Sequence, residues 1–166
     1  MAKGGEAQPL IIRALSRPFL VGLALVSPLA AQAADPAPPV GTKGRLLFVH
    51  DGDTFDATYP DGRRIKTRLS NADTPETGNP GTVNAAKCPE ELEAGKRATS
   101  YVAQLIRSHE VVAISLGRYD KFNRVLATVL VTPAVDGHTD LGALLVYQGL
   151  GRFYRGERRM TWCPEH

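Results

Sequence analysis

The chain has 166 residues and a formal net charge of +3 at pH 7. It contains no internal repeat, which excludes architectures built from repeated units. Residues 1–33 hold three basic residues and one acidic residue, so the rest of the chain is close to neutral. Overall charge therefore gives no reason to expect binding to nucleic acid, and only a local arrangement of charge can indicate it.

The first 33 residues have the features of a secretory signal peptide. Arg13 and Arg17 precede an apolar run at residues 19–26, and small residues follow as far as Ala33. A basic flank, a short apolar segment and a small-x-small end are typical of a cleaved signal. The apolar run is also too short to cross a bilayer comfortably. We expect cleavage at Ala33 or the following residue, and export to the periplasm or the medium.

Residues 34–43 are rich in proline and small side chains and are predicted to be a linker. Residues 44–166 then correspond to about one domain. An apolar run and two alternating segments predict three strands joined by short turns, at residues 46–49, 54–59 and 64–69. Because the first of these segments is apolar throughout, we expect a buried strand there.

A helix is predicted after the third strand, starting at Pro89, because proline suits the first helical position. Two strands at 111–116 and 125–131 follow, and then a last helix capped by Thr139 or Asp140. Three strands, a helix, two strands and a closing helix are the plan of a five-stranded OB-fold barrel. We therefore predict a mainly β, α+β domain with one helix between strands three and four and a C-terminal helix.

The two cysteines, Cys88 and Cys163, are predicted to form a disulfide. In an exported protein, an even number of cysteines usually becomes paired. A zinc site would need further ligands, and the spacing of the four histidines does not supply them. The bridge would tie the start of the predicted helix to the C-terminal tail.

Charged residues gather at the ends of the predicted strands. They are Asp51, Asp53, Arg68, Asp73, Glu76, Lys121 and Arg124. If the strands form a barrel, these residues meet on one face. Carboxylates suit a hard cation such as Ca²⁺ and can also serve as a base toward water. Guanidinium groups bind phosphate bidentately, so the whole set is what phosphodiester cleavage requires.

Four segments occur in the order and rough spacing of the staphylococcal nuclease-like (thermonuclease) family. They read VHDGDTFDA, TRLSNADTPETG, DKFNRVLA and LLVYQGLGR. The sequence resembles this family from residue 44 to about residue 152. The resemblance implies an OB-fold barrel with added helices that hydrolyses DNA and RNA with Ca²⁺.

The resemblance also implies roles for the acidic residues. Asp53 and Asp73 are expected to bind Ca²⁺ together with the carbonyl oxygen of Thr74. Glu76 resembles the general base of the family, and it either deprotonates the attacking water or positions it. Asp51 is expected to support the cation site without binding the ion.

Roles for basic and aromatic residues follow in the same way. Arg68 and Arg124 resemble the arginines that bind the phosphate and stabilise its transition state. Lys121 is expected to help hold a terminal phosphate, whereas Phe122 replaces a tyrosine of the family. Tyr154 is either a platform for stacking a nucleobase or a packing residue.

We expect an exported, monomeric, calcium-dependent nuclease that prefers single-stranded or frayed DNA and RNA. Two alternatives are a non-catalytic OB-fold module that binds single strands and a calcium-stabilised interaction domain. The resemblance ends before the tail, which carries Arg152, Arg155, Arg158 and Arg159. These arginines either follow the backbone of the substrate or belong to a solvated tail held by the disulfide.

Overall fold

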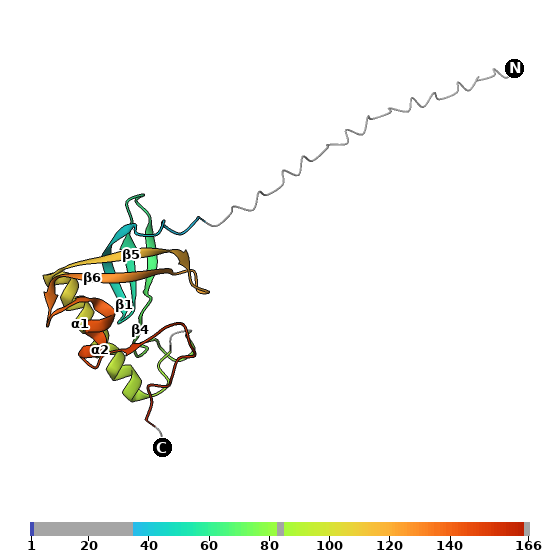
Figure 1. Ribbon diagram of the computed structural model, residues 1–166. Coiled ribbons are helices and arrows are strands. Elements are labelled where there is room, and N and C mark those ends of the chain that lie inside the picture. Colours follow the sequence, from blue (N-terminus) through green and yellow to red (C-terminus); the bar gives the residue numbers. More distant parts are fainter. Residues whose placement is uncertain (2–34, 83–84, 165–166) are drawn as a thin grey trace. The chain divides into compact units, whose positions relative to one another are not determined.

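The computed structural model describes Met1 and residues 35–82 and 85–164 (Figure 1). The chain divides into two units, Met1–Ala34 and Asp35–His166, and the second contains all the helices and strands of the described residues. The predicted signal peptide lies outside the described residues, apart from Met1.

Five strands of the second unit close into a barrel. They are β1 (Lys43–Asp51), β2 (Thr54–Thr58), β3 (Arg64–Leu69), β5 (Glu110–Tyr119) and β6 (Val125–Val135). Neighbouring strands pair in the order β3-β2-β1-β5-β6, and a parallel pairing of β3 with β6 closes the ring. Three short strands complete the set, namely β4 (Ala72–Asp73), β7 (His138–Asp140) and β8 (Arg152–Phe153). The predicted five-stranded OB-fold barrel is thus confirmed.

The alternation of side chains explains the interior of the barrel. In β2, Phe55 and Ala57 point inward and are fully buried, as the sequence pattern predicts. In β1 the prediction of a buried run is wrong, because Leu47 and Phe48 are exposed by 44% and 52%. The register with β2 shifts between Leu46 and Phe48, and this bulge moves the inward positions along the strand by one residue.

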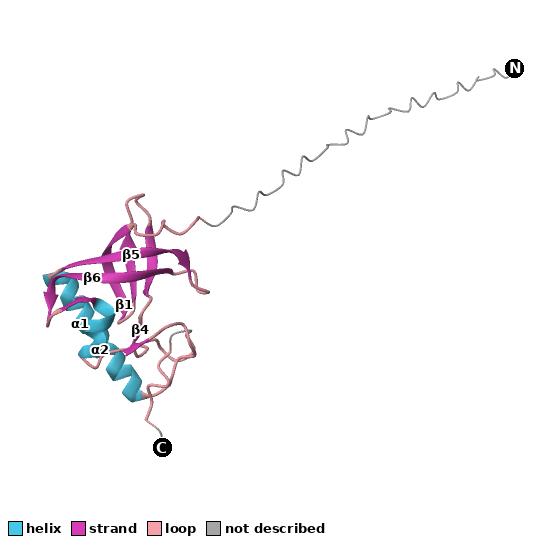
Figure 2. Cartoon of the chain, viewed as in Figure 1, coloured by secondary structure: helices cyan, strands magenta, loops and turns pink. Residues whose placement is uncertain are grey.

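Two helices cover the barrel and contribute to the same core (Figure 2). Helix α1 (Pro89–Ser108) lies between β4 and β5, with Pro89 at its start as predicted. Helix α2 (Leu141–Tyr147) is capped by Asp140, whose side chain accepts a hydrogen bond from the N–H of Ala143. Within residues 35–82 and 85–164, neither helix has the combination of length and hydrophobicity that a membrane span requires.

The predicted linker lies against the barrel in its described part. Pro38 is buried, and its carbonyl oxygen accepts a hydrogen bond of 2.7 Å from the hydroxyl of Ser115 in β5. The N–H of Gly41 donates to the carbonyl of the same serine at 2.9 Å. The segment is therefore seated on β5, and Lys43 already belongs to β1.

The predicted disulfide is present between Cys88 and Cys163, which are 75 positions apart in the sequence. Cys88 is also the N-cap residue of α1, and its sulfur accepts a hydrogen bond from the N–H of Glu91. The bridge therefore fixes the C-terminal tail to the beginning of α1.

Loss of this disulfide is expected to lower the free energy of unfolding by about 4 kcal/mol, because the denatured chain regains the freedom of a long loop. The Cys88→Ser/Cys163→Ser variant suits the test, since serine preserves an N-cap at position 88. Urea unfolding of this variant and of the oxidised protein measures the difference. Equal midpoints and slopes in the two proteins would contradict the expectation.

Candidate active site

One edge of the barrel collects charged side chains from four segments. Asp53 lies in the β1–β2 turn, Arg68 is near the end of β3, Asp73 belongs to β4, and Arg124 immediately precedes β6. Thr54 and Arg68 are paired across β2 and β3, so the turn lies beside the end of β3. The parallel pairing of β3 with β6 brings the start of β6 to the same edge. The closed barrel therefore determines that these four segments meet.

Arg68 lies between two aspartates. Its Nη1 is 2.7 Å from Oδ1 of Asp53, and its Nη2 is 3.1 Å from Oδ1 of Asp73. The N–H of Thr74 donates to Oδ2 of Asp53 at 3.1 Å. These four residues have exposed fractions of only 2–5%. The structure thus brings together the predicted cation ligands and one of the predicted arginines.

Arg124 joins this cluster through Thr54. Its Nη1 donates to Oγ1 of Thr54 at 3.2 Å, and that hydroxyl donates to Oδ1 of Asp53 at 3.0 Å. The guanidinium of Arg124 also contacts Asp120. Its Nε donates to Oδ2 of Asp120 at 2.8 Å, and its Nη2 is 2.7 Å from the same oxygen. Oδ1 of Asp120 also accepts the backbone N–H groups of Phe122 and Arg124, each at 2.9 Å. Asp120 therefore fixes both the turn and the guanidinium group.

Thr54 and Asp120 are site residues that were not predicted from the sequence. Asp120 stands four positions before Arg124 within one hairpin turn, and this spacing is a signal for such a pair. Nothing in the sequence near Thr54 indicates its role. That role depends on Arg124, which is 70 positions away in the sequence and lies just before β6.

Glu76 lies beside Asp73, and an arginine from the C-terminal tail contacts both acids. Nε of Arg159 is 2.8 Å from Oδ1 of Asp73, and its Nη1 forms an ion pair with Glu76. The indole N–H of Trp162 donates to Oδ2 of Asp73 at 3.3 Å. Arg159 was predicted to lie along the substrate or in solvent, and no role was predicted for Trp162. The structure instead places both side chains on the acidic cluster.

Burial disfavours the ionised form of the acids in the cluster, and it raises the pKa of three of them. Burial, reinforced by the charges of Asp53 and Glu76, raises the pKa of Asp51 to about 7. Burial and the charge of Asp53 also raise the pKa of Asp73 and the pKa of Glu76, although Arg159 and Arg68 oppose the rise. An additional cation in the cluster would therefore be electrostatically favourable.

The donor atoms of the cluster suit a hard divalent cation. Asp53 and Asp73 offer carboxylate oxygens, and Thr74, whose N–H donates to Asp53, adds a backbone carbonyl oxygen. The hydroxyl oxygen of Thr74 is buried and has no hydrogen-bond partner among the described residues. A buried oxygen without a partner is costly unless a ligand or an ordered water satisfies it. An all-oxygen set of this kind fits Ca²⁺ or Mg²⁺ better than a thiophilic metal.

The remaining predicted residues lie at the border of the cluster. The ring of Tyr154 is 5.6 Å from the guanidinium carbon of Arg68, and its backbone N–H donates to the carbonyl of Asn71 at 3.1 Å. Lys121 is exposed and lies over the exposed ring of Phe122, with Nζ 5.0 Å from the ring centre. Tyr154 thus meets the predicted site, whereas Lys121 does not contact its carboxylates in the described structure.

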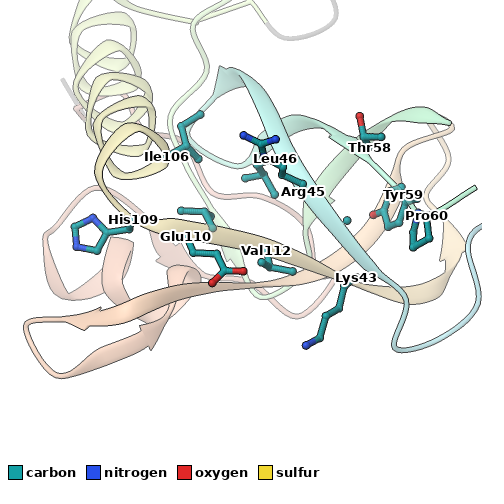
Figure 3. A pocket seen from close by; sticks show the side chains of 12 residues that line it. Lys43, Arg45, Leu46, Thr58, Tyr59, Pro60, Ile106, His109, Glu110 and Val112 are labelled. Carbon is teal, nitrogen blue, oxygen red and sulfur yellow. The ribbon is translucent and has the colours of Figure 1, made fainter. Parts of the chain in front are cut away.

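A separate cavity of about 540 Å³ lies on another part of the barrel (Figure 3). It is lined mainly by residues of β1 and β5, with Lys43, Arg45, His109 and Glu110 among its polar side chains. None of its lining residues belongs to the charged cluster. This cavity is therefore not part of the candidate site.

A closed OB-fold barrel with buried acids and arginines at one edge defines a candidate site for phosphate chemistry. The family described as staphylococcal nuclease homologue matches residues 66–163, which is more than half of the chain, and the chain belongs to this family. The membership supports a nuclease-type function in general terms. A comparison with curated proteins returned no match. The matched region includes Arg68, Asp73, Glu76 and Arg124, whereas Asp53 precedes it.

Helix α1 supports the loop that carries Glu76. A Cβ atom on Gly95 would lie 2.6 Å from the carbonyl oxygen of Glu76 and 2.8 Å from that of Pro75. Such distances cannot persist, so either the loop or the helix has to move. Glycine at this position therefore allows the helix to approach the backbone of the site.

The Gly95→Ala variant is expected to be less stable than the wild type by up to about 2 kcal/mol. Alanine gains about 1 kcal/mol in helix propensity, but overpacking against backbone costs about 1–3 kcal/mol, and we expect the overpacking to dominate. Urea unfolding measures the change. Ser100→Ala on the exposed face of α1 is the control and should change stability by less than about 0.5 kcal/mol. A Gly95→Ala variant at least as stable as the wild type would show that the close approach is unimportant.

Proposed function

We propose that the chain is an exported, calcium-dependent endonuclease that hydrolyses phosphodiester bonds of DNA and RNA. The observation that carries this proposal is the position of Arg68 between Asp53 and Asp73, with Glu76 and Arg124 at the same edge of the barrel. Burying charges of both signs costs several kcal/mol per ion before pairing, so a cluster of this size is better explained by function than by stability.

The carboxylates of Asp53 and Asp73 and the carbonyl oxygen of Thr74 would hold the calcium ion. When bound, the ion supplies Lewis acidity toward a phosphoryl oxygen of the substrate. The unpaired hydroxyl of Thr74 and the raised pKa of Asp73, which burial causes, support a cation at this place. Asp51 is a neighbour that accepts the backbone N–H of Asp53 at 3.1 Å and so orients the ligand turn.

Glu76 would act on the attacking water. Burial raises the pKa of Glu76, and a higher pKa makes the carboxylate a better acceptor for the proton of water. The water oxygen forms a bond to phosphorus while the bond from phosphorus to the 5′-oxygen breaks, and the proton of the water passes to Glu76. The leaving oxygen takes a proton from solvent, and the products end in a 3′-phosphate and a 5′-hydroxyl.

Arg68 and Arg124 would bind the charge that develops on the phosphate. A guanidinium group keeps its charge at any physiological pH and matches two phosphate oxygens at once. Asp120 and Thr54 hold Arg124 in place, so this arginine would need little reorganisation during the reaction. Lys121 would contact a terminal phosphate, and Tyr154 would stack with a base of a single-stranded or frayed substrate.

Export and a monomeric state are part of the proposal. The Cys88–Cys163 disulfide supports export, because such bonds persist mainly outside the reducing cytosol.

Cleavage of labelled single-stranded DNA should require Ca²⁺ and stop when a chelator is added. Glu76→Gln should lower kcat by about 10²-fold or more, since removal of a general base typically has this effect. Glu93→Gln is a matched control, because Glu93 is an exposed glutamate of α1 that pairs with Lys96. Cleavage at the wild-type rate with chelator or in Glu76→Gln would contradict the mechanism. Binding without cleavage by the wild type would instead support the non-catalytic module.

The support of Arg124 by Asp120 can be tested separately. Arg124→Lys should lower kcat by about 10²–10³-fold, because a preorganised donor to the transition state is lost. Asp120→Asn keeps Arg124 but removes its charged partner, and we expect a loss of about tenfold, mainly in kcat. The control is Asp61→Asn, which alters an Asp–Arg pair in the turn before β3, at the strand end remote from Arg68. Equal kinetics of Asp120→Asn and Asp61→Asn would exclude a positioning role for Asp120.

A further inference from the structure

The candidate site is closed in this structure. Asp53, Arg68, Asp73 and Thr74 are each at most 5% exposed. A divalent cation and a phosphate must nevertheless reach these atoms if the site binds them. Some part of the protein that covers the cluster therefore has to move.

The C-terminal strap, which we define as residues 155–163, contacts two acids of the cluster. Arg159 of the strap pairs with Asp73, at 2.8 Å, and with Glu76, and Trp162 donates its indole N–H to Asp73 at 3.3 Å. Both oxygens of the Asp73 carboxylate are thereby engaged by the strap. Burial alone would lower the pKa of Arg159. The negative charges of Asp73, Asp53 and Glu76 outweigh this effect and raise the pKa of Arg159.

The strap is fastened at both ends. Its beginning follows β8, which pairs with β4 through Ala72 and Phe153. Its end is bonded to the start of α1 by the Cys88–Cys163 disulfide, and in Figure 1 the red end of the chain returns to the green beginning of this helix. Between these points, the guanidinium of Arg152 lies 3.8 Å from the ring centre of Trp162 and also donates to the carbonyl of Thr161. These contacts tether the strap, so Arg159 stays close to the acids and has a high effective concentration there.

We propose that the C-terminal strap is a built-in competitor of the divalent cation, with Arg159 occupying at Asp73 the position of positive charge that the cation requires and pairing at the same time with Glu76. This inference rests on the proposed function, because it assumes that Asp73 is a cation ligand. The strap must open for the cation to bind, since the guanidinium and the ion use the same carboxylate oxygens. Opening also frees Glu76 from its ion pair with Arg159, so one movement releases both the cation ligand Asp73 and the base.

Competition of this kind lowers the apparent affinity of the cation by the fraction of molecules in which the strap is open. Removal of Arg159 should therefore tighten cation binding, whereas removal of a neighbouring charge should not. Arg158 supplies the matched control, because it is an exposed arginine of the same strap without a contact to an acid among the described residues.

The experiment is calorimetric titration of the full chain with Ca²⁺ alone, in wild type, Arg159→Gln, Arg158→Gln and Asp73→Asn. We expect Arg159→Gln to bind Ca²⁺ about tenfold more tightly than wild type, Arg158→Gln to bind as wild type, and Asp73→Asn to lose binding. The only tryptophan of the chain is Trp162, so its fluorescence gives a second signal. Its emission should shift toward longer wavelength when Ca²⁺ displaces the strap from the wild type.

Equal Ca²⁺ affinity in wild type and Arg159→Gln, with unchanged tryptophan emission, would overturn the strap proposal while leaving the cation site intact. If Arg159→Gln instead lowered kcat at saturating Ca²⁺ with an unchanged dissociation constant, Arg159 would be a phosphate ligand and not a competitor. If neither wild type nor Arg159→Gln bound Ca²⁺, the proposed calcium chemistry itself would fail. The three unfavourable results are thus distinguishable.

Discussion

The buried ion pairs of Arg68 with Asp53 and Asp73 are the interaction on which the rest of the site depends. They join the β1–β2 turn, the end of β3 and β4, which are consecutive in the chain but belong to different parts of the barrel edge. Arg68 offsets part of the cost of burying the two carboxylates, because a buried charge without a partner costs several kcal/mol. The guanidinium of Arg68 is also the proposed phosphate ligand, and the two carboxylates are the proposed cation ligands. The contacts that stabilise the cluster and its proposed chemistry therefore use the same atoms.

The closed barrel supplies the frame for this interaction. A parallel pairing of β3 with β6 brings Arg124 to the edge where Arg68 lies, although 56 positions separate the two arginines in the sequence. Gly95 lets α1 approach the loop that carries Glu76. The C-terminal strap then closes over the cluster and is fixed to α1 by the disulfide. Burial of the charges is thus a result of three separate packing events and one disulfide around one edge.

Local signals made most of the fold predictable. Proline at the start of α1, Asp140 before α2 and the alternation in β2 each act within a few residues, so the sequence pattern is sufficient to locate the elements. The prediction for β1 was wrong at Leu47, which alternation turns outward, and at Phe48, where a bulge in the pairing with β2 moves the inward position to Val49. A bulge depends on the neighbouring strand, and a single apolar run gives no sign of it.

By itself, the sequence determined the order of the elements, the family resemblance, the pair of cysteines and the acids and arginines at the strand ends. Only the tertiary structure decided that Arg159 returns to Glu76 across 83 positions and that Trp162 contacts Asp73 across 89. It also decided that Thr54 connects Arg124 to the acids. The reason is physical: helix, strand and turn preferences act over a few residues, whereas these contacts require barrel closure and a disulfide to bring distant segments together.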